Sequence, residues 1–121
     1  LDPQEERAKF ISLREALFLI ANAKGKTAQE AAATLALTLR RSAQWQSLQI
    51  CEFRDEHGML SAELRKNRLF QLLDRLATEN LHSPVMDDDD QFHSDFLYRC
   101  DPDFENLGFN RDDFMKLLNA S

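Results

Sequence analysis

Cysteine is scarce in this sequence, since Cys51 and Cys100 are the only two among 121 residues and stand far apart. Such a pair is typical of reduced, partly buried thiols and does not form the disulfide framework of a small secreted domain. No apolar run approaches the roughly twenty residues that span a bilayer, and no signal peptide is visible. These absences favour a cytoplasmic protein, although the chain begins with Leu1 and a trimmed start stays open.

The sequence motifs of common enzyme and metal sites are also missing. There is no nucleophile elbow, no phosphate-binding glycine loop and no paired-carboxylate pattern. His57, His82 and His93 never stand at a metal-ligand spacing from one another or from a cysteine. We therefore predict a protein that is not an enzyme, with no catalytic residue, no metal site and no cofactor.

One acidic pattern imitates the spacing of a calcium loop without its key residues. It consists of carboxylates at positions 101, 103, 105 and 112. Asn106 occupies the position of the sharp-turn glycine, and Gly108 replaces the usual apolar residue. The pattern therefore favours a turn followed by an acidic helix start over a calcium site.

Two helix starts stand fifteen residues apart and organise the first half of the chain. Ser12 is followed three residues later by Glu15, and Thr27 by Glu30, which is the spacing of a reciprocal capping box. Gly25 lies between them and can end the first helix in the left-handed conformation. The spacing predicts helices over 13–23 and from 28 to 39 or 41, joined by a short turn.

The remaining pattern predicts a hairpin and two further helices. Strands are expected over 48–53 and 59–64 around a turn at 54–58, with Trp45 packed on the helical pair. Apolar spacing predicts a helix over 66–79, a surface loop over 80–91 and an edge strand over 95–100. Asn110 and Asp113 cap a last helix ending near residue 118, stapled by Phe109 against Phe114. We predict one α+β domain, residues 1–121, that is mainly helical, with a polar lead-in over 1–9 that carries a helical turn at 4–9.

The order helix, helix, hairpin, helix resembles winged helix-turn-helix DNA-binding domains over residues 12–64. Ala21 and Gly25 have the spacing that this group uses around its turn, while Lys26 and Thr34 stand where it has apolar residues. More loosely, the segment Gly108 to Asp113 is similar to one in small uncharacterised proteins of bacterial plasmids and prophages.

The resemblance implies that the second helix enters the major groove of duplex DNA. Its leading end would carry Thr27, Gln29, Glu30 and Ala33. Phosphate contacts would come from Lys24, Lys26, Arg40, Arg41 and Arg54, with Arg65, Lys66 and Arg68 as a further basic cluster. The alternative is that these are ordinary solvated charges on a helical adaptor.

Charge is distributed unevenly along the chain. Residues 1–70 carry eleven Lys and Arg against nine Asp and Glu, whereas residues 71–121 carry four against twelve. The first half could therefore bind DNA or a nucleoprotein complex weakly and in a salt-dependent manner, as a regulatory or adaptor domain. Alternatively, the acidic, Phe-rich second half could bind a protein with a basic surface, as an adaptor or inhibitor. Its candidate residues are Asp87, Asp88, Asp89, Asp90, Phe92 and Phe96.

Overall fold

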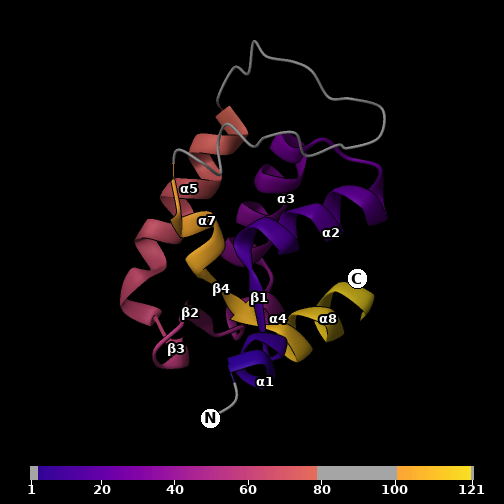
Figure 1. Cartoon of the computed structure of the whole chain (residues 1–121). Coiled ribbons are helices and arrows are strands. Elements are labelled where there is room, and N and C mark those ends of the chain that lie inside the picture. The colour runs from indigo at the N-terminus through magenta and orange to yellow at the C-terminus, as the bar shows by residue number, and fades with distance from the viewer. Residues whose placement is uncertain (1–2, 79–100, 121) are drawn as a thin grey trace.

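The computed structural model describes residues 3–78 and 101–120, and it confirms a mainly helical α+β fold with a small antiparallel sheet (Figure 1). Its elements in chain order are α1 (Pro3–Ala8), β1 (Phe10–Ser12), α2 (Leu13–Lys24), α3 (Ala28–Arg41), α4 (Ala43–Gln46), β2 (Ile50–Arg54), β3 (Gly58–Ser61), a 3-10 turn η1 (Glu63–Arg65), α5 (Lys66–Thr78), α7 (Asp103–Asn106), β4 (Leu107–Asn110) and α8 (Arg111–Ala120). No helix in these two ranges is long and apolar enough to span a bilayer.

Both predicted capping boxes are present at the starts of α2 and α3. The Ser12 hydroxyl accepts from the backbone N–H of Glu15 at 3.1 Å, and the Glu15 carboxylate accepts in return from the Ser12 N–H. Thr27 and Glu30 repeat this exchange at 3.1 and 3.0 Å. Gly25 ends α2 with φ 62°, the left-handed conformation that glycine adopts most readily. The helix-turn-helix outline is therefore confirmed.

The sheet contains two strands that the sequence did not predict. Its order is β1-β4-β2-β3, all antiparallel, so β4 from the C-terminal part lies between β1 and the predicted hairpin. Gly108 lies opposite both Ser12 and Cys51. A Cβ atom there would be 2.9 Å from the Ser12 Cα and closer still to the Ile11 carbonyl oxygen. The close approach of β1 to β4 therefore requires glycine at this position.

The hairpin strands are shorter than predicted at their outer ends. Leu48 does not enter the sheet, because its N–H closes a turn onto the carbonyl of Trp45 at the end of α4. The second strand stops at Ser61 and is followed by η1, so Leu64 lies outside the sheet. Gly58 has φ 76°, as expected for the end of the turn. The helical turn predicted over 4–9 is present as α1, which begins and ends one residue earlier.

The larger of the two apolar clusters in the described residues lies between the helices and the sheet. Leu69, Leu72, Leu73 and Leu76 of α5 are all buried, which confirms the predicted apolar face, and α5 packs against α3. Trp45 meets Phe114 edge-on with ring centroids 5.6 Å apart. Phe109 stacks on Phe114 at 5.7 Å, while the Asn110 side chain accepts from the Asp113 N–H. The predicted cap and staple of α8 are thus confirmed, although α8 extends to Ala120.

Candidate interaction surface

Arg40, one of the predicted phosphate contacts, is held by an ion pair within the fold. Its two terminal nitrogens donate to the two carboxylate oxygens of Asp74 on α5 at 3.1 and 2.8 Å. The guanidinium also lies 4.4 Å from the ring centroid of Phe70. Hydrogen bonding to Asp74 raises the pKa of Arg40 and lowers the pKa of the Asp74 carboxyl. This arginine is therefore used to join α3 to α5.

Arg65 and Arg68, from the predicted basic cluster, belong to a chain of alternating charges. Arg65 donates to Glu52 of β2 at 2.6 Å and to Asp103 of α7 at 3.0 Å. Arg68 donates to Asp103 at 2.9 Å and also to Asp101. The hydrogen bond to Asp103, and to a smaller extent the one to Asp101, raises the pKa of Arg68. The three carboxylates are largely buried, and this row of ion pairs joins β2 and α5 to α7.

Three of the four carboxylates that imitated a calcium loop, Asp101, Asp103 and Glu105, therefore accept hydrogen bonds from arginines. Asp101 accepts from Arg68 and from the backbone N–H of Asp103. Within residues 3–78 and 101–120, no group of three His, Cys, Asp or Glu side chains could hold a metal ion. Arg54, which is exposed to solvent, adds a further ion pair to this network by donating to Glu52 at 3.3 Å.

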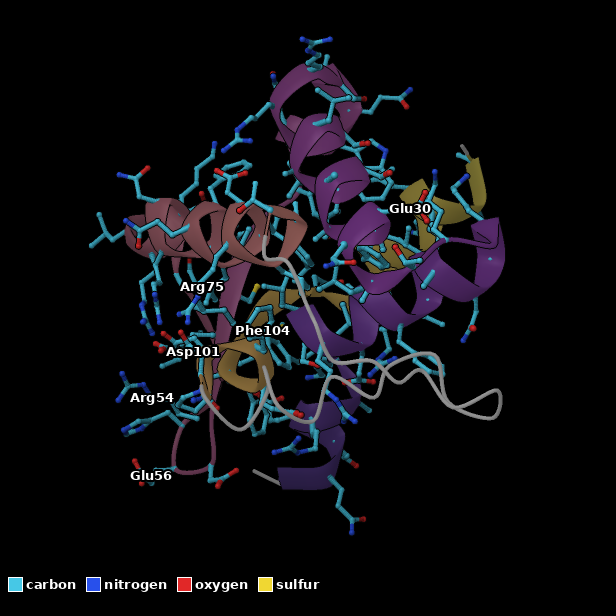
Figure 2. All side chains as sticks on the ribbon, turned by 90° about the horizontal axis from the view of Figure 1, so that it is seen from above. Glu30, Arg54, Glu56, Arg75, Asp101 and Phe104 are labelled. Atoms are coloured by element: carbon cyan, nitrogen blue, oxygen red, sulfur yellow. The ribbon has the colours of Figure 1, made fainter. Side chains whose placement is uncertain are left out.

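The other predicted nucleic-acid contacts are spread over the molecule. Lys24 and Lys26 flank the α2–α3 turn, Arg41 ends α3, and Lys66 begins α5. No ion pair holds these four side chains among the residues that the structure describes. Glu30, which marks the α2–α3 turn, lies on the opposite side of the molecule from Arg54 (Figure 2). The candidate phosphate contact Arg54 therefore lies away from the start of α3.

Helix α3 has one exposed face, which we call the α3 face: Glu30, Ala33, Leu37 and Arg41. These residues follow one another at spacings of three and four, so they form a stripe along the helix. Leu37 is 50% exposed at its centre, whereas Ala31, Leu35 and Leu39 on the opposite side are buried. Hydrogen bonds from the backbone and the side chain of Thr27 lower the pKa of the Glu30 carboxyl, which favours its charged form. The face thus combines an apolar centre with an acidic and a basic end.

The residues predicted to read bases have few side-chain donors or acceptors left for hydrogen bonds to a base edge. Thr27 uses its hydroxyl as the helix cap, and Glu30 uses a carboxylate oxygen on the Thr27 N–H. Ala33 has no polar group in its side chain, and Gln29 is partly buried. Sequence-specific reading in the major groove depends on side-chain donors and acceptors at these places.

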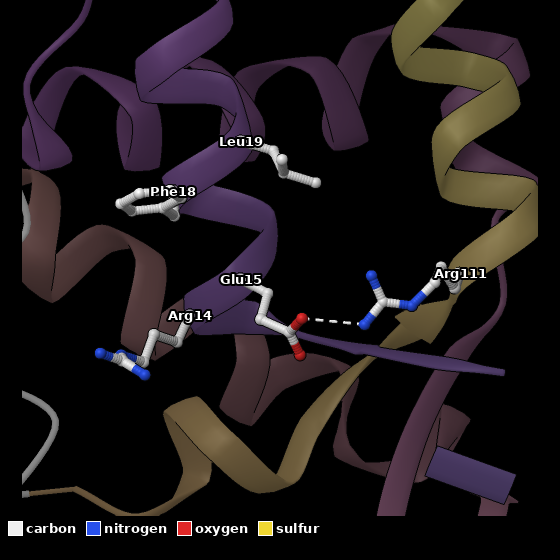
Figure 3. A pocket seen from close by; sticks show the side chains of 5 residues that line it. All are labelled: Arg14, Glu15, Phe18, Leu19 and Arg111. Carbon is white, nitrogen blue, oxygen red and sulfur yellow. Dashed lines mark hydrogen bonds and ion pairs between the residues drawn. The ribbon is translucent and has the colours of Figure 1, made fainter. Parts of the chain in front are cut away.

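A cavity of about 280 Å³ lies between α2 and the start of α8. It is lined by Arg14, Glu15, Phe18, Leu19 and Arg111 (Figure 3). Glu15 accepts from Arg111 at 2.8 Å. Burial of Glu15 favours its protonated form, but the bonds from Arg111 and Ser12 outweigh this effect and lower its pKa. The charges that line the cavity are therefore paired, and none is a poised nucleophile or base.

Several predicted residues fall outside the described ranges or carry no site. The candidate protein-binding residues Asp87, Asp88, Asp89, Asp90, Phe92 and Phe96 lie outside the described residues, as do Cys100, His82, His93 and the edge strand predicted over 95–100. Cys51 is a buried free thiol whose pKa is raised by burial, which suits a packing role in the sheet. His57 lies in the hairpin turn, as expected.

Comparisons with protein-family models, with curated proteins and with solved structures gave no match to this chain.

Proposed function

We propose that this chain is a non-catalytic interaction domain that binds a protein helix through the α3 face. The observation that carries the proposal is the half-exposed Leu37 beside Ala33, midway between charges of opposite sign. An apolar anchor with a small neighbour lets a partner helix approach closely, and flanking charges fix its orientation. The helix itself is firmly held, because capping at Thr27 and packing on α5 order it before any partner arrives.

A protein partner fits these observations better than DNA does. The arginines expected to meet phosphates are largely occupied by carboxylates of the same chain. A duplex would have to displace those carboxylates, and the unpaired Asp101 and Asp103 would then repel it. A helical partner on the α3 face requires no such rearrangement.

The test compares two exposed leucines at different places on the surface. Leu37→Asp places a charge at the centre of the α3 face, whereas Leu64→Asp makes the same change on η1, where the leucine is 101% exposed. A partner captured from host extract is identified and purified, and its affinity is measured by calorimetry. We expect Leu37→Asp to weaken binding at least about tenfold and Leu64→Asp to leave it unchanged. Equal affinities of both variants and the wild type would refute the α3 face as the binding site.

DNA or nucleoprotein binding is the second candidate, favoured by one specific observation. Lys24 and Lys26 stand beside the exposed start of α3, at the turn formed by Gly25. Phosphates at this end would also benefit from the positive end of the helix dipole. The expected affinity for duplex DNA is low and strongly salt-dependent.

Replacing Lys24, Lys26 and Arg41 together with alanine tests this second candidate without disturbing the Arg40–Asp74 pair. Each lost phosphate contact should flatten the dependence of log affinity on log salt by about one unit. Fluorescence anisotropy with a labelled duplex measures both quantities. Identical salt slopes for the wild type and the triple variant, or no binding by the wild type at low salt, would exclude this candidate.

A further inference from the structure

The charges of the α3 face are arranged so that the face complements itself. Glu30 lies near the start of α3 and Arg41 at its end, with Ala33 and Leu37 between them. We infer that the partner helix is α3 of a second copy of this chain, packed antiparallel about a twofold axis. This inference rests on the proposed use of the α3 face and names its occupant.

The positions of these residues along the helix support the antiparallel register. At 1.5 Å per residue, Glu30 and Arg41 are separated by about 16 Å, and the midpoint lies between Ala33 and Leu37. A twofold axis through that midpoint brings each Glu30 level with the partner's Arg41, and each Leu37 to within about 2 Å of the level of the partner's Ala33. It also sets each Leu37 beside the partner's Ala33, so a large side chain meets a small one. In a twofold interface of this kind, each contact between two different residues occurs twice.

Other orientations lack this match. Two α3 helices packed parallel would place Glu30 against Glu30 and Arg41 against Arg41, and like charges at an interface are unfavourable. The neighbouring cation Arg40 does not change the pattern, because Asp74 and Phe70 hold it on the side of α5. Lys26, the other cation near Glu30, precedes the helix and lies beyond the ends of the apolar centre. Charge therefore selects the antiparallel pair.

Sedimentation of the full chain over a range of concentrations tests the inference. The wild type should associate to a dimer, and Leu37→Asp should weaken the dimer at least tenfold, with Leu64→Asp as the matched control. Glu30→Arg alone and Arg41→Glu alone should each weaken it at least tenfold, because each sets like charges opposite one another. The double variant should recover to within a few-fold of the wild type.

Mixing the two single variants provides a second test, in which the same altered helix cap is present in both the Glu30→Arg homodimer and the heterodimer. Glu30→Arg removes one half of a capping box, so circular dichroism must first show that α3 is intact, and Glu30→Gln offers a neutral variant that keeps the cap. A Glu30→Arg chain opposite an Arg41→Glu chain has opposite charges at both ends of the interface. The mixture should therefore form heterodimers more tightly than either variant alone forms homodimers.

Two results would overturn the inference. One is a wild type that stays monomeric at every concentration, and the other is charge reversals that leave association unchanged. If the wild type is monomeric but Leu37→Asp abolishes binding of an identified protein, the α3 face is a binding site for that protein and the second copy is excluded. If neither association nor partner binding depends on Leu37, the proposed function fails as well.

Discussion

Gly108→Ala should be among the most damaging single-methyl additions in this protein. Gly108 lies in β4, between β1 and β2, and an alanine Cβ would be 2.9 Å from both the Ile11 carbonyl carbon and the Ser12 Cα. Ordinary contacts between carbon atoms are about 3.5–4.0 Å, so β1 and β4 must separate by roughly 1 Å. Neither strand can move freely, because Ile11 and Phe109 are both fully buried.

The expected cost follows from the contacts that the shift disturbs. Overpacking in a close-packed core costs about 1–3 kcal/mol, and each weakened β1–β4 hydrogen bond adds about 1 kcal/mol. The smaller entropy of the unfolded alanine chain offsets about 0.4–1 kcal/mol. With two such hydrogen bonds weakened, we expect Gly108→Ala to lower the free energy of unfolding by about 2–5 kcal/mol, measured by urea denaturation followed by circular dichroism.

Gly25→Ala is the matched control for this prediction. Gly25 has φ 62°, but a Cβ there meets nothing within 4 Å. Its substitution costs only the left-handed backbone conformation, about 1–2 kcal/mol, and Gly25→Asn should cost less because asparagine tolerates that conformation. If Gly108→Ala proves no more destabilising than Gly25→Ala, the close contact between β1 and β4 is not what requires glycine at residue 108.

Three further changes test the core and the ion pairs. Leu72→Ala should cost about 2–5 kcal/mol in urea denaturation, because the side chain is only 1% exposed; a loss below about 1 kcal/mol would place it at the surface. Arg68→Met should cost about 2–4 kcal/mol, because it leaves the buried Asp101 without its guanidinium, whereas Arg40→Met breaks an exposed pair and should cost at most about 1 kcal/mol. Equal losses would contradict this difference. Glu15→Gln keeps the helix cap but removes a carboxylate whose pKa is lowered, because bonds to its arginine and serine partners outweigh burial. That stabilisation, under about 1 kcal/mol, is present above the ordinary value of 4.5 and lost as pH falls through the folded pKa, so wild type and variant should converge in acid.

Helices α2, α3 and α8 were predictable because the interactions that start and stop them are local, whereas the single-turn helices α4 and α7 were not predicted. Ser12 meets Glu15, and Thr27 meets Glu30, within three residues of chain, and Gly25 needs only its own backbone conformation. Such signals can be recognised without knowing the fold. The same holds for α8, whose cap at Asn110 lies three residues before its partner.

Strands β1 and β4 could not be recognised in this way. Each is only three or four residues long, too short to show alternation of apolar and polar side chains. Their pairing joins Phe10 to Asn110, across almost the whole chain. Gly108 was the available signal, because an isolated glycine next to apolar residues can mark a close approach between backbones, but it does not name the neighbour.

The basic residues show a different limit of sequence reasoning. A cation at the start of a helix opposes the helix dipole, so Arg65, Lys66 and Arg68 at the start of α5 invite a functional explanation. The structure gives another reason for two of them, because Arg65 and Arg68 bind carboxylates from α7 and the segment before it, more than thirty residues away. The spacing of Asp101 and Asp103 imitates part of a calcium loop, and the basic cluster was a candidate nucleic-acid contact. These acidic and basic residues bind each other within the fold, which is why neither group carries the proposed function.

The α3 face has no unusual sequence pattern that would mark it as a site, yet it leaves Leu37 half exposed between opposite charges. A surface of this kind becomes visible only when burial is known for the rest of the helix, since the same spacing of apolar residues also describes a core.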